Sequence, residues 1–533
     1  MYPAATGTLY CMSDQTVPES SLPAPAPNGT GSLPASSPGT TEATDDFTVR
    51  RHTAPSGLRY TTTTGRMVLR REEIRDGRAH GFLPKAEIFM VAYTADDAGA
   101  PARADGRSRT QKKAVPPEPN RRPVVFAFNG GPGSASVWLH MGLLGPRLVD
   151  SGDVGAMVPA PYGITDNPES LLEHADLVMI DPVNTGFSRV VHGGTADEFH
   201  AFIEDRDLVA EVIRLWVTRN NRWLSPKYLV GESYGTLRAV AVARRLFESH
   251  GLAVNGLGLV SPVLNLSTLD FRPGNDTPYA LHLPTYAAIA HYHGRHGNRR
   301  LEDVVRDAED YASGDFVVAL HLGNRLSKRK YDAVVKHLAE LTTLSEAFIR
   351  RTNLRWEYME FATELLREKG LMVGRIDGRF AGQPPRLQES HTWDDPSLRA
   401  IAGPYSAAIN HYVRAELGYA SDLPYEVLTG RVQPWSYRTF EGAPVDVTQD
   451  LERLLVDLPE LRVHVDYGYH DGATPHYAAE YVWAHMNLTA QAQARFTHLY
   501  HEAGHMMYLK PQCRSAQLEA LAALVGATAP AAG

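Results

Sequence analysis

The sequence predicts an α/β fold with a mostly parallel central sheet flanked by helices, and two observations support this prediction. Short apolar runs recur in the middle of the chain, and such runs are typical of strands buried on both faces of a parallel sheet. Segments with helical periodicity separate these runs, and strands that alternate with helices indicate an α/β architecture. The predicted strands are 124–128, 176–181, 228–231 and 257–261, and the predicted helices between them are 201–219 and 236–248.

The N-terminal part of the chain differs in composition. Residues 1–45 are rich in Pro, Ser, Thr, Ala and Gly, so they bury too little apolar surface to offset the entropy of ordering and are expected to be disordered. Residues 58–72 and 82–93 have the pattern of an antiparallel hairpin. The polar stretch 96–120 is expected to form an exposed loop.

The later part of the chain is predicted to hold a large helical insertion. Helical periodicity dominates residues 266–442, with the clearest helices at 286–292, 301–317, 330–352 and 355–369. Strand patterns return at 461–467 and 495–500, and a closing helix is predicted at 511–525. We therefore expect a tail (1–45), a first core part (46–265), a mainly helical insertion that acts as a lid (266–442) and a second core part (443–533).

Composition excludes several classes of partner. The net charge is −8 and no arginine run is present, so neither nucleic acid nor an anionic membrane surface is expected to bind. No apolar run reaches the roughly 18 residues of a membrane span. Cys11 and Cys513 match neither a disulfide framework nor a metal site. The N-terminus shows no basic and apolar secretory signal, which favours a cytoplasmic location.

A candidate nucleophile follows one of the buried strands. Gly231-Glu-Ser-Tyr-Gly235 lies between the strand at 228–231 and a helix, and Gly-x-Ser-x-Gly in that context is the nucleophile elbow of the α/β-hydrolase fold. The turn is so tight that side chains two positions either side of the serine would collide, which glycine avoids. Ser233 is then exposed at a helix N-terminus, where the free N–H groups favour negative charge.

A candidate base follows the last predicted strand. His505 occupies the position at which this fold places its catalytic histidine. The same segment also matches the zinc motif His-Glu-x-x-His through His501, Glu502 and His505, which makes a zinc metallopeptidase the rival hypothesis. That motif needs both histidines on one face of a helix. Residues 496–500 alternate like a strand, and Gly504 weakens a helix by roughly 1 kcal/mol, so a metal is not expected.

The catalytic acid is expected in the loop after the strand at 461–467. We predict that Asp471 in that loop is the catalytic acid, although Asp466 and His470 lie close by in the sequence. The order Ser233, Asp471, His505 is the chain order of this fold. An ionised acid fixes the tautomer of the imidazole and stabilises the imidazolium that forms during attack.

A glycine-rich turn is the candidate oxyanion hole. Asn129-Gly-Gly-Pro-Gly133 follows the strand at 124–128 and lets the backbone approach the reacting carbonyl. The backbone N–H groups of Gly131 and Tyr234 are expected to bind the developing oxyanion.

Together these segments resemble the serine carboxypeptidases. The resemblance covers roughly 124–263 and 463–509 and leaves the insertion unassigned. Five blocks match in order: Asn129-Gly-Gly-Pro-Gly133 with Gly145-Pro146, Asp166-Asn-Pro-Glu-Ser170, Ile180-Asp-Pro-Val-Asn-Thr-Gly-Phe-Ser188, Gly231-Glu-Ser-Tyr-Gly235 and Ala503-Gly-His-Met506.

The resemblance implies removal of a C-terminal residue from peptides, often best at acidic pH and without a cofactor. It implies that Asn129 and Glu232 hydrogen-bond the terminal carboxylate of the substrate, and that Met506 lines the pocket for the departing residue. A carboxyl group donates to a carboxylate only while it is protonated, which favours low pH.

Three positions depart from the family pattern. Ala127 stands where the family usually has Trp, Leu143 where a second glutamate is expected to share a proton with the first, and Tyr508 where Pro is common. The triad survives these changes, but the carboxylate clamp is altered. An esterase, amidase or acyltransferase with the same triad is therefore the alternative function, because fold and triad do not fix the substrate. A catalytically silent binding protein is a further alternative.

Overall fold

The computed structural model describes residues 43–96, 121–152, 154, 158–192, 194–386 and 394–526. The predicted disordered tail and the predicted loop at 96–120 lie almost entirely outside the described residues. Within the described residues, no helix combines the length and apolar character needed to cross a bilayer.

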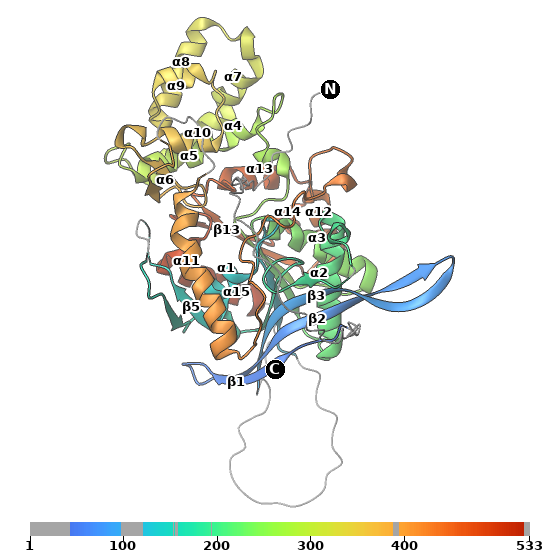
Figure 1. The fold of residues 1–533 in the computed structure, drawn as a ribbon. Coiled ribbons are helices and arrows are strands. Elements are labelled where there is room, and N and C mark those ends of the chain that lie inside the picture. The colour runs from blue at the N-terminus through green and yellow to red at the C-terminus, as the bar shows by residue number, and fades with distance from the viewer. Residues whose placement is uncertain are drawn as a thin grey trace, which may run out of the picture.

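A single large sheet forms the centre of the molecule (Figure 1). Its order is β1-β2-β3-β7-β4-β9-β10-β13-β14, with β8 paired to β3. The strands are β1 (Thr48–Thr53), β2 (Arg59–Arg75), β3 (Arg78–Ala95), β4 (Val124–Phe128), β7 (Asp176–Ile180), β8 (Arg189–Val190), β9 (Lys227–Glu232), β10 (Gly256–Val260), β13 (Arg462–Gly468) and β14 (Phe496–His501).

The sheet combines an antiparallel edge with a parallel centre. Strands β1, β2, β3 and β7 pair antiparallel in turn, so the predicted hairpin is confirmed as β2 and β3. From β7 the neighbours β4, β9, β10, β13 and β14 are all parallel. Two small antiparallel pairs lie outside this sheet: β5 (Arg147–Asp150) with β6 (Gly163–Asp166), and β11 (Met372–Val373) with β12 (Ala381–Gly382).

Helices cover both faces of the sheet, as predicted. The helices are α1 (Val137–Leu139), α2 (Phe202–Arg219), α3 (Tyr234–His250), α4 (Thr277–Leu281), α5 (Leu283–Tyr292), α6 (Leu301–Tyr311), α7 (Val317–Leu322), α8 (Lys328–Thr342), α9 (Glu346–Arg351), α10 (Tyr358–Glu364), α11 (Pro396–His411), α12 (Thr448–Asp457), α13 (His476–His485), α14 (Ala490–Gln493) and α15 (Pro511–Gly526). Alternate residues of a strand point to opposite faces, so Phe126 packs in one core cluster with α2 and α3, while Val125 and Ala127 pack in a second with α11 and α15.

The segment between β10 and β13 is mainly helical, and Figure 1 shows α4 to α10 gathered above one end of the sheet. These helices have a core of their own, which includes Tyr286, Leu338 and Phe361. Helix α11 instead packs against the sheet-side core through Ile401, Tyr405 and Ile409. We propose, as from the sequence, that the segment 266–442 acts as a lid on a core formed by the rest of the fold.

The prediction of one helix at 330–352 is wrong, because the structure has two helices, α8 and α9, in this stretch. Helix α8 ends at Thr342, because the next residue, Thr343, has a φ of 59°, in the left-handed region that stops a right-handed helix. Helix α9 then begins after Ser345, whose hydroxyl accepts a hydrogen bond from the backbone N–H of Phe348 at 3.1 Å. A helix cap therefore interrupts the apolar periodicity.

Other predicted helices differ in length, and one was missed. The helix predicted at 355–369 is the shorter α10 followed by a 3₁₀ turn, and α6 continues through a π-helical segment into α7. Helix α11, which contains Pro404, was not predicted. Asp395 caps its N-terminus by accepting from the backbone N–H of Ser397 at 2.9 Å.

Candidate active site

The candidate nucleophile lies in the tight turn between β9 and α3. Ser233 has φ 61° and ψ −130°, a strained conformation for a residue with a side chain. A Cβ on Gly231 would lie 2.1 Å from the carbonyl oxygen of Gly235, so only glycine fits there. The sequence motif thus produces the expected elbow, in which the serine side chain stands away from the strand.

The candidate acid and histidine are in direct contact. Nδ1 of His505 lies 2.7 Å from Oδ2 of Asp471, and both residues are buried. The backbone N–H groups of Ala473 and Thr474 donate to the other carboxylate oxygen of Asp471 at 2.8 and 2.9 Å. The Thr474 hydroxyl donates to Oδ2 at 2.8 Å. These bonds hold the carboxylate in one orientation toward the imidazole.

The contact between acid and histidine also determines their ionisation. Burial alone would raise the pKa of Asp471, but the charge and hydrogen bond of His505 lower it overall. Burial likewise opposes the imidazolium, yet Asp471 raises the pKa of His505 above its usual value. The pair therefore favours an ionised acid and a more basic imidazole, as base catalysis requires.

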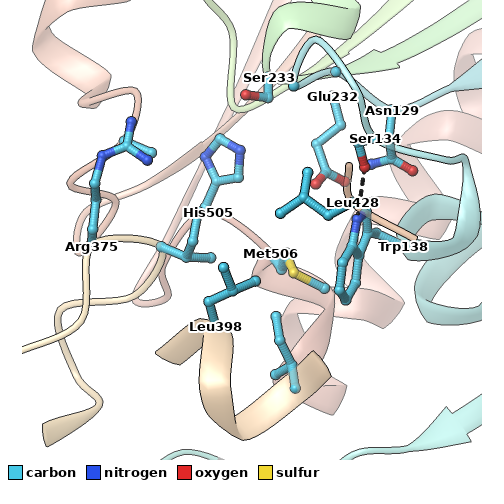
Figure 2. Close-up of a pocket in the computed structure, with 15 residues that line it drawn as sticks. Asn129, Ser134, Trp138, Glu232, Ser233, Arg375, Leu398, Leu428, His505 and Met506 are labelled. Atoms are coloured by element: carbon cyan, nitrogen blue, oxygen red, sulfur yellow. Dashed lines mark hydrogen bonds between the residues drawn. The ribbon is translucent and has the colours of Figure 1, made fainter. Parts of the chain in front are cut away.

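Ser233 and His505 line the same cavity, and Figure 2 shows the imidazole beside the serine hydroxyl. The loop that carries His505 is fixed on two sides. The backbone N–H of His505 donates to the carbonyl of Ile376 at 2.7 Å, and the carbonyl of His505 accepts from the Ser261 hydroxyl at 2.7 Å. The structure thus brings together the three residues predicted as a triad from three distant parts of the chain.

The predicted oxyanion donors lie at the same end of the sheet. Tyr234 is the first residue of α3, where backbone N–H groups have no partner within the helix. Gly131 lines the cavity with φ 103°. A Cβ on Gly130 would lie 2.5 Å from the backbone nitrogen of Tyr234, so the glycine turn is in close contact with the helix start.

A buried arginine ties the glycine turn to α3. Arg238 donates to the carbonyl of Asn129 at 2.5 Å and pairs with Asp205 at 2.7 Å. Its guanidinium lies 5.1 Å from the ring centroid of Tyr234. This contact positions both halves of the candidate oxyanion hole.

Glu232 and Asn129, the predicted carboxylate clamp, also line the cavity. Burial raises the pKa of Glu232 to about 7, although His505, Tyr508 and Asn129 each lower it. The Tyr508 hydroxyl donates to Oε2 of Glu232 at 2.7 Å. Oδ1 of Asn129 accepts from the backbone N–H of Leu139 at 3.1 Å, which leaves the amide nitrogen as the donor toward the cavity.

The wall beside this clamp is apolar. Met506, predicted to line the pocket for the departing residue, lies there next to Trp138 (Figure 2). The indole N–H of Trp138 donates to the Ser134 hydroxyl at 2.9 Å, which satisfies the polar edge of the ring. The segment between β10 and β13 completes the wall with Leu398, Ile401 and Leu428.

The rival zinc motif does not form a metal site. His501 is the last residue of β14 and His505 lies in the loop beyond it, so the two do not share a helix face. Nε2 of His501 lies 2.9 Å from Oδ1 of Asp466, whereas His505 contacts Asp471. The side chain of Glu502 is 59% exposed. In the described residues, the one group with metal-ligand spacing is Glu309, His476 and Glu480, away from this cavity.

The residues near Asp471 in the sequence have other partners. Asp466 accepts from both His464 and His501, and His470 is buried with a pKa well below its usual value because of burial. Sequence reasoning missed Thr474, Tyr508 as a partner of Glu232, and Arg375 on the cavity wall. Position 474 follows the acid by three residues, a spacing at which a threonine commonly bonds back to an aspartate.

One known protein family matches most of this chain. The profile of the serine carboxypeptidase family matches residues 110–512. No curated protein sequence matches this chain.

Similar solved structures include proline iminopeptidase from Mycobacterium smegmatis, with 13% identity, a TM-score of 0.33 and coverage of 86% of this chain and 100% of that one. Another is a thermostable carboxyl esterase from Bacillus coagulans, with 14% identity, a TM-score of 0.34 and coverage of 87% and 98%. The parallel sheet, the elbow and the matched span together show that this chain has the α/β-hydrolase fold and belongs to the serine carboxypeptidase family.

Proposed function

We propose that the protein is a serine-type carboxypeptidase that removes the C-terminal residue of peptides through an acyl-enzyme on Ser233. The observation that carries this proposal is the buried carboxyl of Glu232 directly beside the nucleophile, with a pKa raised to about 7 by burial. A protonated Glu232 and the amide of Asn129 supply two donors for a terminal carboxylate.

The chemistry follows from the contacts of the triad. His505 accepts the hydroxyl proton of Ser233 as the oxygen attacks the scissile carbonyl carbon, and Asp471 stabilises the imidazolium. The N–H groups of Gly131 and Tyr234 stabilise the oxyanion, and such a donor is worth about 10²–10³ in rate. The C–N bond then breaks as His505 protonates the departing amine. Water, deprotonated by His505, hydrolyses the acyl-enzyme and restores Ser233.

The cavity also suggests the class of departing residue. Trp138, Met506 and Leu428 line the side of the cavity on which Glu232 and Asn129 lie (Figure 2). A side chain next to the clamped carboxylate would contact this apolar wall. We therefore propose that apolar C-terminal residues are removed fastest.

A peptide mass ladder tests the proposal. A peptide with a free C-terminus should lose residues stepwise from that end at pH 5.5 and pH 7.5, and Ser233→Ala should abolish the loss. The same peptide with an amidated C-terminus is the control, because it lacks the carboxylate that the clamp binds. Turnover of simple esters with both peptides left intact would reject the carboxypeptidase and favour the esterase alternative.

A further inference from the structure

Arg375 lies in the loop between β11 and β12, in the segment between β10 and β13 that the sequence blocks of the family do not include. Its backbone is fixed next to the triad. The backbone N–H donates to Oδ1 of Asp395 at 3.1 Å, and the carbonyl accepts from the backbone N–H of Gly472, the residue after Asp471, at 3.0 Å. The side chain therefore starts from a rigid position at the cavity rim.

The guanidinium of Arg375 has no acidic partner among the described residues, although it lines the cavity. This differs from the nearby Arg379, which pairs with Asp377 at 2.6 Å. Asp395, which binds the backbone of Arg375, also accepts hydrogen bonds from the backbone of Ile376 and from the Ser397 hydroxyl. A permanent positive charge thus faces the site, and no carboxylate of the residues that the structure describes forms an ion pair with it.

The position of Arg375 relative to the clamp decides which part of a substrate it meets. Figure 2 shows Ser233 and His505 between Arg375 on one side and Glu232 with Asn129 on the other. A substrate whose terminal carboxylate lies on the clamp places its scissile carbonyl at Ser233. Its chain N-terminal to that bond, the acyl portion, then extends toward Arg375.

We propose that Arg375 is a specificity-determining residue that binds the carboxylate side chain of the residue before the cleaved bond. This inference rests on the proposed carboxypeptidase function and adds a substrate class to it: peptides with Glu or Asp in the penultimate position. An arginine fork binds a carboxylate through two parallel hydrogen bonds, which lysine cannot reproduce.

Matched peptides test this assignment. Two peptides that differ only by Glu or Gln in the penultimate position have side chains of the same length and nearly the same shape, but only Glu carries a charge and a second accepting oxygen. For the wild type we expect kcat/KM to be about fivefold to tenfold higher with the Glu peptide. Arg375→Gln should reduce the ratio to about one, and Arg375→Glu should invert it. Arg306→Gln, an exposed arginine of α6 with 65% side-chain exposure, is the matched control and should keep the wild-type ratio.

A second pair of substrates separates the two proposals. The p-nitrophenyl esters of N-acylated Glu and Gln carry the same acyl portions without a terminal carboxylate. The Glu preference should persist with these esters and disappear in Arg375→Gln. If the esters show the Glu preference and neither peptide is cleaved, the carboxypeptidase proposal fails while the role of Arg375 stands.

Other outcomes overturn the role of Arg375. Equal kcat/KM for Glu and Gln substrates in the wild type would contradict this role. A Glu preference that survives in Arg375→Gln would contradict it as well. If Arg375→Gln slows both peptides equally and leaves both esters unaffected, Arg375 binds the terminal carboxylate instead, and the proposal is wrong.

Discussion

Tyr508 donates its phenolic hydrogen to Oε2 of Glu232 at 2.7 Å, and both side chains are buried. The sequence departs from the family pattern at this position and also at Leu143, where a second glutamate is expected. Two carboxyl groups that share a proton require acidic conditions, whereas a phenol donates to a carboxyl in either protonation state. Tyr508 thus supplies a hydrogen-bond partner for Glu232 that does not depend on a shared proton.

Tyr508→Phe should shift the alkaline limb of the peptidase pH profile upward. The clamp requires protonated Glu232, so kcat/KM for peptides should fall as pH rises through the pKa of Glu232, about 7. The bond from Tyr508 lowers this pKa, so its removal should raise the midpoint by about 0.5–1 pH unit. The measurement is kcat/KM against pH for one peptide. An ester without a terminal carboxylate is the control, and a downward shift would contradict the clamp.

Asp471→Asn should lower kcat by about 10⁴ without unfolding the protein, because an amide cannot hold the histidine in the reactive tautomer. Thr474→Val should cost far less, about tenfold, since it removes one hydrogen bond to the carboxylate and leaves its charge. Both variants are compared by steady-state kinetics after circular dichroism shows a native spectrum. Similar losses for the two variants would mean that orientation, and not charge, is the main contribution of Asp471.

The parts of the site that the sequence predicted are those on short, local motifs. Local composition reveals the strand and helix boundaries of this fold. These boundaries predict the elbow at Ser233, the glycine turn and the chain order of the triad. The strands β4, β7, β9 and β10 were likewise predicted within a residue or two, because each contains a short apolar run.

The parts that were missed depend on contacts between distant segments. The pairing of Tyr508 with Glu232 spans 276 residues, and no local pattern encodes it. Arg375 reaches the cavity only because the loop between β11 and β12 packs against the loop of Asp471. In the helical segment, caps such as Ser345 interrupt the hydrophobic periodicity on which the helix predictions relied.

Asp466→Asn should destabilise the fold without removing the triad. Asp466 is fully buried between His464 and His501, and loss of its charge should cost about 3 kcal/mol in the free energy of unfolding at pH 6. Burial favours neutral forms, yet the pairing lowers the pKa of Asp466 to about 2 and raises that of His501 to about 9. The stabilisation from Asp466 is therefore present above pH 3.8, its ordinary pKa, and is lost as pH falls toward 2.

The contribution of His501 has the opposite pH dependence. It is full below pH 6.5, the ordinary pKa of histidine, and is lost as pH rises through about 9. Thermal denaturation of wild type and Asp466→Asn at pH 6 and pH 9.5 should therefore show a smaller difference in Tm at pH 9.5. A constant difference across this range would contradict a charged His501–Asp466 pair.

A fluorophosphonate probe should separate the two histidines of the His-Glu-x-x-His segment. Such probes react with an activated serine, so labelling of Ser233 should fall by about 10³-fold or more in His505→Asn, which removes the base. His501→Asn should keep labelling within a few-fold of wild type at 20 °C, because His501 contacts Asp466 and not Asp471. Mass spectrometry locates the adduct, and Ser233→Ala is the blank.

Loss of labelling in both histidine variants, with a native spectrum retained, would mean that the two histidines act as one unit. Sensitivity of peptidase activity to a chelator, with Ser233 unlabelled in the wild type, would instead revive the zinc hypothesis.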